Sequence, residues 1–213
     1  MRGDAMKMRL ILLIFYVSFG STLAFAEAIK LKDEEHSNII NGDYKEYYPS
    51  GALQWERHYR NGKKHGEYKE FYESGNIKTE GSYDSGMLVG TERRFYENGL
   101  EAEIHFEMGE PAYLKMYYDS GELLGEVKFK NGKYHGLTKY SYKNGNIKRE
   151  FHYVDGQKNG EERYYYENGN LQSLANIVND QYEGKASIYD IQGKLAGEII
   201  YKNGEVVSQK QFE

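Results

Sequence analysis

Glycine, aromatic and aliphatic residues recur at fixed intervals along the chain. Seven units can be aligned, and they begin at Gly42, Gly66, Gly90, Ala112, Gly136, Gly160 and Gly184. The interval is 24 residues throughout, except in the third unit, which has 22. A fixed period of this length is typical of a repeat protein in which each unit packs on its neighbours. Positions within a unit are counted here from zero at these seven residues.

Two glycine columns divide each unit into two strands. Position 9 is glycine in all seven units, and Ser, Asn or Gln precedes it. A pair such as Asn144-Gly145 between strand-like runs predicts a two-residue hairpin turn in which both residues have positive φ. A second glycine near position 20, replaced by Asp180 in the sixth unit, predicts a longer return turn. The pattern therefore predicts strand, tight turn, strand and longer turn in every unit, or about 14 strands.

The hairpin turn sets a register that can be checked against the sequence. If positions 8 and 9 form the turn, the positions of facing residues sum to 17. Tyrosine at position 6 would then face an aliphatic residue at position 11, as Tyr48 faces Leu53. A basic residue at position 3 would face a glutamate at position 14 in most units. The predicted charge pairs are Lys45–Glu56, Lys69–Glu80, Arg93–Glu103, Lys115–Glu126 and Lys139–Glu150.

Strand alternation assigns these columns to two faces. Positions 6, 11, 15 and 17 are expected on one face, and the Lys/Glu columns with position 5 on the other. The aromatic residues at position 5, called the aromatic row, are Tyr47, Phe71, Phe95, Tyr117, Tyr165 and Tyr189. The predicted fold class is all-β, an elongated antiparallel β-meander of about seven double-strand repeats. A twisted single-layer sheet is expected, because no helical segment is available to cover a face.

The units resemble the MORN-repeat variant of bacterial proteins, as in Gly66-Glu-Tyr-Lys-Glu-Phe-Tyr-Glu-Ser-Gly75 and Tyr83-Asp-Ser-Gly86. Many proteins with such repeats are identified as members of the YwqK-type antitoxin family. The resemblance covers residues 42–204 and implies a β-meander scaffold that binds a partner. Two features depart from the family. The third unit is short, and the N-terminal segment resembles an export signal, whereas an antitoxin against a cytosolic toxin should not be exported.

Residues 1–26 have the layout of a secretory signal. Arg2, Lys7 and Arg9 form a basic start, Leu10–Phe19 is apolar, and Ala24-Phe25-Ala26 supplies small residues for cleavage. The apolar run is much shorter than the roughly 20 residues that cross a bilayer. We predict cleavage after Ala26, export to the periplasm or the cell exterior, and no transmembrane segment in the mature chain. An uncleaved interfacial anchor is the alternative.

Composition narrows the class of partner. The chain has 22 Tyr, 24 Gly, 2 Pro and no Cys, which suits short strands joined by turns and excludes disulfides. Loss of residues 1–26 removes three basic residues and Asp4, leaving 25 basic and 32 acidic residues and a net charge of −7. This balance predicts no binding of nucleic acid. Residues 27–41 precede the repeats of 42–207, and 208–213 are predicted to be a C-terminal tail or edge cap.

No arrangement of residues in the repeat indicates catalysis, a cofactor or a metal. His58, His105 and His152 share position 16 but occupy alternate units, roughly 19 Å apart along a sheet. One zinc ion cannot span that distance. Glutamates at position 14 stand roughly 10 Å apart, beyond the separation used by most pairs of catalytic carboxylates. We therefore predict a protein that is not an enzyme and needs no cofactor or metal.

The aromatic row is the candidate binding surface, because tyrosine combines an apolar ring with a polar tip and is common at interfaces. The competing interpretation is that the rings stack on one another only to stabilise an uncovered sheet. The predicted function is an exported scaffold that binds another protein or a cell-envelope component. An antitoxin or immunity protein and a repeat that binds envelope polysaccharide or lipid are the alternatives. The two unpaired edges of an open meander also allow self-association.

Overall fold

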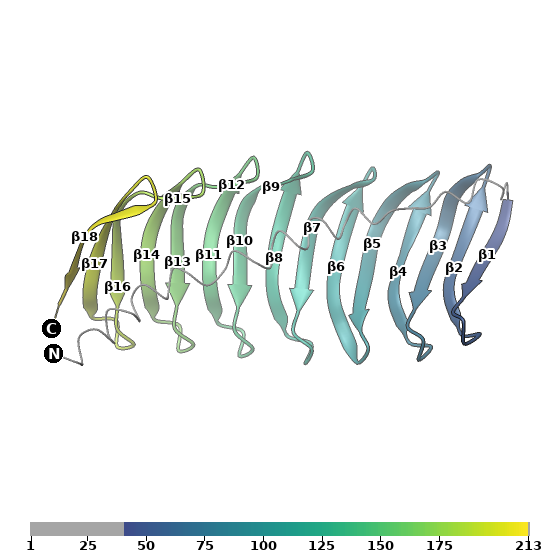
Figure 1. The fold of residues 1–213 in the computed structure, drawn as a ribbon, viewed down its shortest axis with the longest axis horizontal. Helices are drawn as coiled ribbons and strands as arrows, with labels where there is room; N and C mark the ends of the chain where they lie inside the picture. The colour runs from purple at the N-terminus through teal and green to yellow at the C-terminus, as the bar shows by residue number, and fades with distance from the viewer. Residues whose placement is uncertain (1–40, 213) are drawn as a thin grey trace. The chain divides into compact units, whose positions relative to one another are not determined.

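The computed structural model describes residues 41–212, which form one antiparallel sheet without helices (Figure 1). The all-β meander predicted from the repeat is therefore confirmed. The predicted signal peptide over residues 1–26 and the segment 27–40 lie outside the described residues.

The strands follow one another across the sheet in chain order (Figure 1). The first half contains β1 (Asn41–Tyr47), β2 (Leu53–Arg60), β3 (Lys63–Phe71), β4 (Ile77–Asp84), β5 (Met87–Tyr96), β6 (Gly99–Glu107), β7 (Glu110–Tyr117), β8 (Leu123–Lys130) and β9 (Lys133–Tyr134). The second half contains β10 (Gly136–Ser141), β11 (Ile147–Val154), β12 (Gln157–Lys158), β13 (Gly160–Tyr165), β14 (Leu171–Val178), β15 (Gln181–Tyr182), β16 (Gly184–Tyr189), β17 (Leu195–Lys202) and β18 (Glu205–Gln211).

The short strands β9, β12 and β15 are arms of the return turns rather than separate strands of the meander. Each has two residues and pairs with the end of the strand before it, as Tyr153 pairs with Lys158. The long strands then pair directly, β8 with β10, β11 with β13 and β14 with β16. The described residues thus contain fifteen long strands, one more than predicted, because β18 extends the sheet beyond the seventh unit.

The two kinds of turn are the reverse of the prediction. The return turns are the tight ones: Asn61 and Gly62 have φ of 52° and 73°, and both central residues have positive φ at all seven return turns. This is the type I′ hairpin turn. In six units only the glycine at position 9 has positive φ, 88° at Gly51, and the Tyr48 carbonyl accepts from Gly51 N at 2.9 Å. Gly99 of the third unit does not have positive φ, and it pairs with Tyr96 across a two-residue turn. A type I turn followed by a left-handed glycine explains the longer connection in the other six units.

A β-bulge beside this turn changes the predicted register. In the first unit Glu46 pairs with Trp55 but Tyr47 pairs with Leu53, which leaves Gln54 as the bulged residue. The predicted pairing of Tyr48 with Leu53 is therefore wrong. In all seven units the aliphatic residue at position 11 faces the residue at position 5 instead. Position 11 therefore lies on the same face as position 5 and not, as had been expected, with positions 15 and 17.

The position 6 tyrosines connect neighbouring units. The Tyr48 hydroxyl donates to the Phe71 carbonyl at 2.8 Å, and the Tyr142 hydroxyl donates to the Tyr165 carbonyl at 2.8 Å. Tyr72, Tyr118 and Tyr166 form the same bond to position 5 of the following unit. These five hydrogen bonds, called the tyrosine clamps, tie the position 9 turn to the following unit in every unit except the third and the seventh. In the seventh unit Asp190 takes the place of tyrosine, and its carboxylate accepts from two amides of its own turn.

The short third unit lacks a clamp, and its position 9 turn has one residue fewer than the others. Four residues separate the facing pair Phe95 and Leu100, whereas five separate Tyr47 and Leu53. The hairpin of β6 and β7 is also one residue shorter, since Glu103 pairs with Lys115, one residue closer along the chain than Glu56 and Lys69. Its return turn keeps two central residues, so the missing residue lies in the bulged part of the strands. Within residues 41–212 the hydroxyl of Tyr96 makes no hydrogen bond, and this side chain is 41% exposed.

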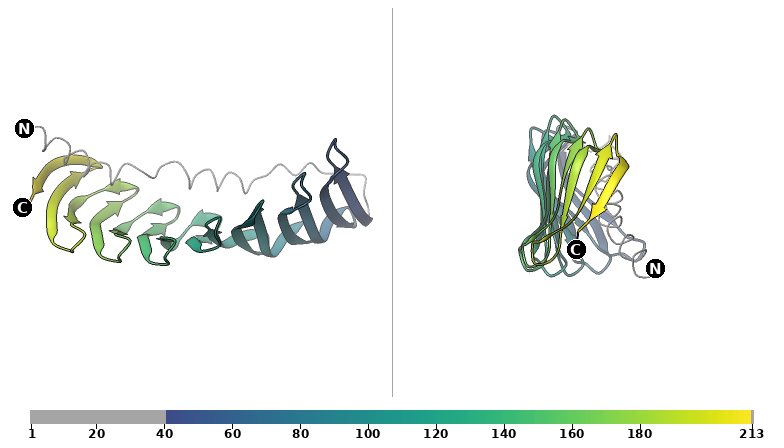
Figure 2. Two further views of the ribbon diagram at one scale, coloured as in Figure 1. Left: turned by 90° about the horizontal axis from the view of Figure 1, so that it is seen from below. Right: turned by 90° about the vertical axis from the view of Figure 1, so that its left-hand side faces the viewer.

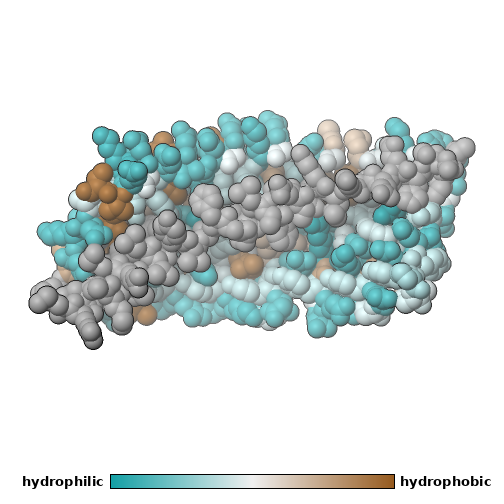
Figure 3. Space-filling model, viewed as in Figure 1, coloured by the Kyte–Doolittle hydropathy of each residue, from teal (hydrophilic) through white to brown (hydrophobic). Residues whose placement is uncertain are grey.

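One face of the sheet, called the packed face, carries positions 2, 4, 13, 15 and 17 and holds the hydrophobic core. Ile104, Leu114 and Ile199 are at most 2% exposed there. Return-turn residues add rings to this face: Tyr134 lies 5.1 Å from Tyr153 between ring centroids, and Tyr182 lies 5.2 Å from Tyr201. The strands curve along their length (Figure 2). The rims formed by the turns are largely hydrophilic where they are visible (Figure 3).

The tyrosine clamps predict a repeat-specific loss of stability. Replacing Tyr142 with Phe removes its partly buried hydrogen bond to the Tyr165 carbonyl and should lower the free energy of unfolding by about 1 kcal/mol. Urea denaturation followed by circular dichroism measures this change. Tyr96→Phe is the matched control, because it alters the same column without breaking a bond, and it should change stability by less than about 0.5 kcal/mol. Equal losses in the two variants would contradict the clamp.

Candidate binding surface on the ladder face

The face opposite the packed face carries a continuous row of alternating charge, called the charge ladder. All five predicted Lys/Glu and Arg/Glu pairs are confirmed, and pairing between units joins them into one line. In order across the sheet the line is Lys45, Glu56, Lys69, Glu80, Arg93, Glu103, Lys115, Glu126, Lys139, Glu150 and Arg163. Each residue has an oppositely charged Cα partner on both sides, except at the two ends.

Four of the ten neighbouring pairs in the ladder form partly exposed ion pairs. Lys45 Nζ lies 3.0 Å from Glu56, and Arg93 lies 3.1 Å from Glu103 and 3.7 Å from Glu80. Pairs of this kind contribute less than about 1 kcal/mol each. Their main effect is on register, because a slip by one residue would break the whole row of opposite charges. The ladder ends where Arg163 faces Leu174.

The structure places the aromatic row on this same ladder face, as the alternation predicted. The Tyr117 hydroxyl donates to Glu103 at 2.8 Å, and the Tyr165 hydroxyl donates to Glu150 at 2.8 Å. Partial burial and these bonds raise the pKa of Tyr117 to about 12 and the pKa of Tyr165 to about 12. Tyr47 is 57% exposed at the N-terminal edge, whereas Phe71, Phe95, Tyr117, Tyr165 and Tyr189 are half-buried.

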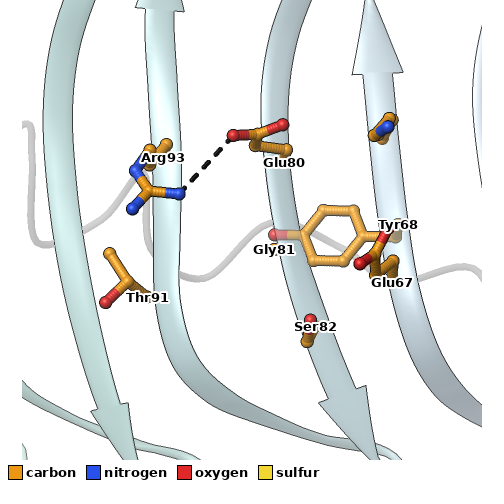
Figure 4. Close-up of a pocket in the computed structure, with 8 residues that line it drawn as sticks. Glu67, Tyr68, Glu80, Gly81, Ser82, Thr91 and Arg93 are labelled. Carbon is orange, nitrogen blue, oxygen red and sulfur yellow. Dashed lines mark ion pairs between the residues drawn. The ribbon is translucent and has the colours of Figure 1, made fainter.

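A hollow of about 330 Å³ opens in the ladder face between β3, β4 and β5 (Figure 4). It is lined mainly by polar side chains, namely Glu67, Lys69, Glu80, Ser82, Thr91 and Arg93, with Gly81 and Tyr68 beneath them. Ser82 and Thr91 are small where other units carry His58, His105 or Tyr113. Sequence reasoning did not identify this hollow, although the run of small residues in adjacent units was the available signal.

The packed face contains a buried polar cluster that sequence reasoning also missed. Arg149 donates through Nε to Glu162 at 2.8 Å, and the Tyr182 hydroxyl donates to the other oxygen of the Glu162 carboxylate. Glu162 is 1% exposed and Arg149 is 8% exposed. Burial and the Glu162 carboxylate raise the pKa of Tyr182. In the third unit, Glu92 accepts in the same way from Tyr68 and Arg94. Such enclosed pairs hold the sheet in one packing arrangement.

The histidines of position 16 do not converge. His58 Nδ1 lies 2.6 Å from Asp43, while the His105 ring stacks 5.0 Å from Tyr113 and contacts Thr91 at 3.2 Å. Within residues 41–212, no group of three acidic or histidine side chains is arranged to hold a metal ion. Nor does this part of the chain contain a helix that could cross a membrane.

Two edge strands complete the surface. Among residues 41–212, β1 pairs only with β2 and β18 only with β17, so residues 208–211, expected in a tail or edge cap, are part of an edge strand. Because fifteen long strands alternate in direction, β1 and β18 run the same way. If a second copy were placed edge to edge by simple translation, β18 of one copy would lie parallel to β1 of the next. Lys210 would then lie close to Lys45, and this repulsion between like charges opposes head-to-tail extension of the sheet.

A protein-family model described as MORN repeat variant matches six segments of the chain, residues 40–63, 64–85, 88–108, 113–131, 134–155 and 158–179. Together these segments cover more than half of the sequence. The seventh unit is not among them, although β16 and β17 pair as the other hairpins do. No curated protein matches the chain significantly.

Solved structures share parts of the fold at low sequence identity. Accessory secretory protein 1, 2 and 3 of Streptococcus pneumoniae is 19% identical with a TM-score of 0.31, covering 52% of this chain and 20% of that one. The Gap123 glycosylation-associated complex of Streptococcus agalactiae is 18% identical with a TM-score of 0.31, covering 54% and 22%. S. aureus TarM is 17% identical with a TM-score of 0.35, covering 50% and 21%. The chain thus spans about a fifth of these longer proteins.

The raised pKa values in the aromatic row predict a specific pH dependence. Tyr117 and Tyr165 hold their protons up to a pKa of about 12 in the folded state, whereas an unfolded tyrosine titrates near pH 10. Their stabilisation is therefore complete below about pH 10 and is lost as the pH rises toward 12. The double variant Tyr117→Phe, Tyr165→Phe should show a shallower fall in unfolding free energy over that range, measured by urea denaturation. Parallel pH profiles for variant and parent would contradict the raised pKa values.

Proposed function

We propose that this chain, which belongs to the MORN repeat variant family, is an exported, non-enzymatic scaffold that binds a protein or cell-envelope partner through its ladder face. The observation that carries the proposal is the alignment of partly exposed aromatic side chains on one face of consecutive units. Aromatic residues between polar neighbours are the side chains most often found at the centre of interfaces.

The arrangement of rings supports binding over the competing interpretation of self-stacking. Ring contacts occur on the packed face, for example Tyr68 with Tyr83 at 4.9 Å and Phe129 with Tyr134 at 5.1 Å. Within residues 41–212, no two members of the aromatic row contact each other as rings. They lie instead against the aliphatic residues of position 11. Because the rings of the row do not stack on one another, one side of each ring is available to a partner.

The proposed absence of catalysis follows from how the acidic groups are used. Each carboxylate of the ladder faces Lys or Arg on both neighbouring strands, and Glu92 and Glu162 are enclosed on the packed face. A general acid or base needs a pKa set for proton transfer and access to a substrate. An immunity role against a toxin that acts outside the cytoplasm is the second candidate, favoured by the resemblance of the repeats to the YwqK-type antitoxin family.

Partner capture tests the proposal. The triple variant Phe71→Ser, Phe95→Ser, Tyr117→Ser should lose most captured material when tagged protein is incubated with envelope and secreted fractions and analysed by mass spectrometry. The physical reason is the loss of three rings from the centre of the surface. Val154→Ser with Val178→Ser is the matched control, because these side chains are 48% and 45% exposed at the return-turn rim.

Thermal unfolding of the same variants separates binding from folding. A triple variant that folds and captures the same partners as the parent would refute the proposed surface. A triple variant that does not fold would instead support the interpretation that the rings stabilise the sheet. In that case the single variant Phe95→Ser, which leaves Phe71 and Tyr117 in place, is used to test whether the rings are needed for partner capture.

Export makes a separate prediction. If residues 1–26 are a signal peptide, the mature protein begins at Glu27 and carries a net charge of −7. Cell fractionation followed by mass spectrometry of the intact protein should find this shortened form outside the cytoplasm. Ala24→Arg with Ala26→Arg should block cleavage, because signal peptidase requires small residues there. A full-length protein confined to the cytoplasm would refute export.

A further inference from the structure

The first strand of the sheet uses only one side of its backbone within the described residues. Among residues 41–212, β1 pairs only with β2, in an unbroken register from Asn41 to Glu46. In an antiparallel pair alternate residues direct their N–H and C=O groups to opposite sides of the strand, so half of these groups in β1 point outward. An edge of this kind is a template for pairing with a strand of another molecule. The side chains of β1 then decide which strand fits.

The charges of β1 have opposite signs on the two sides of its central residue. The strand has seven residues, NGDYKEY, and Tyr44 is the middle one. Asp43 precedes Tyr44 and Lys45 follows it, and both lie on the ladder face, because each pairs with a residue of that face on β2. Their side chains are 68% and 46% exposed. Such a strand is complementary to a second copy of itself that runs in the opposite direction.

Two copies of β1 can pair antiparallel about a two-fold axis that passes beside Tyr44. An axis perpendicular to the sheet leaves each face on its own side, so facing residues share a face. In this register Asp43 of one copy faces Lys45 of the other, and the symmetry forms the same pair twice. Tyr44 faces its own counterpart on the packed face, and all seven residues of β1 take part.

Charge opposes the other antiparallel registers. An axis beside Asp43, Lys45 or Glu46 would place two identical charges directly opposite each other. An axis beside Gly42 would leave only residues 41–43 paired. An axis between two residues would pair side chains from opposite faces, which the alternation of a regular strand does not allow. The sequence of β1 therefore selects the register centred on Tyr44.

The opposite edge of the sheet is less suited to self-pairing. The register between β17 and β18 shifts between Ile200 and Tyr201, which leaves Val207 as a bulged residue. A bulge twists an edge strand and interrupts its row of hydrogen-bonding groups, and proteins use this device to protect an edge. Pairing of β1 with β18 of another copy is opposed by Lys45 and Lys210, which have the same charge. The edge formed by β1 is thus the one that accepts a second copy.

We propose that the protein forms a symmetric dimer in which β1 pairs antiparallel with β1 of a second copy, held in register by two Asp43–Lys45 pairs. Lys45 is the first residue of the charge ladder and has one acidic Cα partner, Glu56, within its own chain. Asp43 of the second copy supplies the acidic partner on its other side.

The dimer joins two ladder faces into one surface. Because the two-fold axis is perpendicular to the sheet, both ladder faces lie on the same side of the extended sheet. A partner that carries two copies of its own binding element meets two equivalent sites, which raises the apparent affinity without a new contact. This goes beyond the proposed function, since it sets how many binding faces one assembly presents.

The small interface sets the strength of the dimer. Each copy contributes one strand of seven residues, whereas a standard interface uses about 20–30 residues from each partner. We therefore expect a dimer that dissociates on dilution, with a dissociation constant on the order of micromolar. Sedimentation velocity of the full chain, purified as the cell produces it, measures the proportion of dimer over a series of concentrations.

Paired charge substitutions test the register. Lys45→Glu brings two carboxylates together in both pairs, and Asp43→Lys brings two ammonium groups together. Each variant alone should weaken dimerisation about tenfold or more. An equal mixture of the two variants should restore the dimer, because both pairs between the different copies again have opposite charges. Recovery in the mixture also shows that both variants fold.

A cysteine at the two-fold axis gives a second readout. The chain contains no Cys, so Tyr44→Cys introduces a single thiol. Facing residues of antiparallel strands have Cα atoms about 4.5–5.5 Å apart, within the range that a disulfide spans, so mild oxidation should link the two copies. Tyr47→Cys is the matched control: this position is 57% exposed, and its counterpart would lie six residues along the strand, roughly 20 Å away. It should not form the link.

The possible outcomes separate the proposed dimer from other uses of the edge. Loss of the dimer in each charge variant, its recovery in the mixture and selective linkage through Tyr44→Cys would support the pairing. A protein that remains monomeric at high micromolar concentration would overturn it and leave the edge to a strand of another protein or to residues 27–40. A dimer that both charge variants retain, and that Tyr44→Cys does not link, would overturn it as well and place the interface elsewhere.

Discussion

The structure depends on pairing between consecutive strands, because a sheet of one layer has no second layer to pack on. Backbone pairing from β1 to β18 forces side chains to alternate between two faces, and one register holds across unit boundaries. The charge ladder and the packed face are two results of this register. The tyrosine clamps add a third connection, since five of the position 9 turns are bonded to the following unit. Stability is therefore shared between neighbours.

The third unit shows how much this regularity matters. Its two missing residues leave the pairing of the charged positions intact, so the charge pair Arg93–Glu103 forms as in other units. The position 9 turn changes, however: Tyr96 pairs with Gly99 at the end of the strand, and within residues 41–212 it forms no clamp. The same region contains the hollow of the ladder face, just before the shortened turn. The unit that departs from the repeat thus lies beside the most distinctive feature of the surface.

The two faces divide structural and binding roles. Polar groups on the packed face are enclosed, as Glu162 is by Arg149 and Tyr182, and removing one partner would leave a buried charge. Ladder ion pairs are partly exposed and contribute little stability individually. Their regular spacing instead gives the face a nearly neutral row of hydrogen-bonding groups beside the aromatic rings. Substitutions on this face change the stability little, and its side chains are regularly spaced. Such a surface is suited to recognition of an extended partner.

The sequence by itself determined the repeat, the all-β meander, the charge pairs such as Lys45–Glu56 and the placement of the aromatic row on the charged face. These features follow from spacing and two-residue alternation, which are local properties of a strand. Only the tertiary structure decided the turn types, because pairs such as Asn144-Gly145 are compatible with both kinds of hairpin. It also decided the bulge that pairs Tyr47 with Leu53, the clamps and the burial of Glu162 against Arg149. Each of these joins side chains or carbonyls from different strands or units, and their geometry is set only when the strands are assembled.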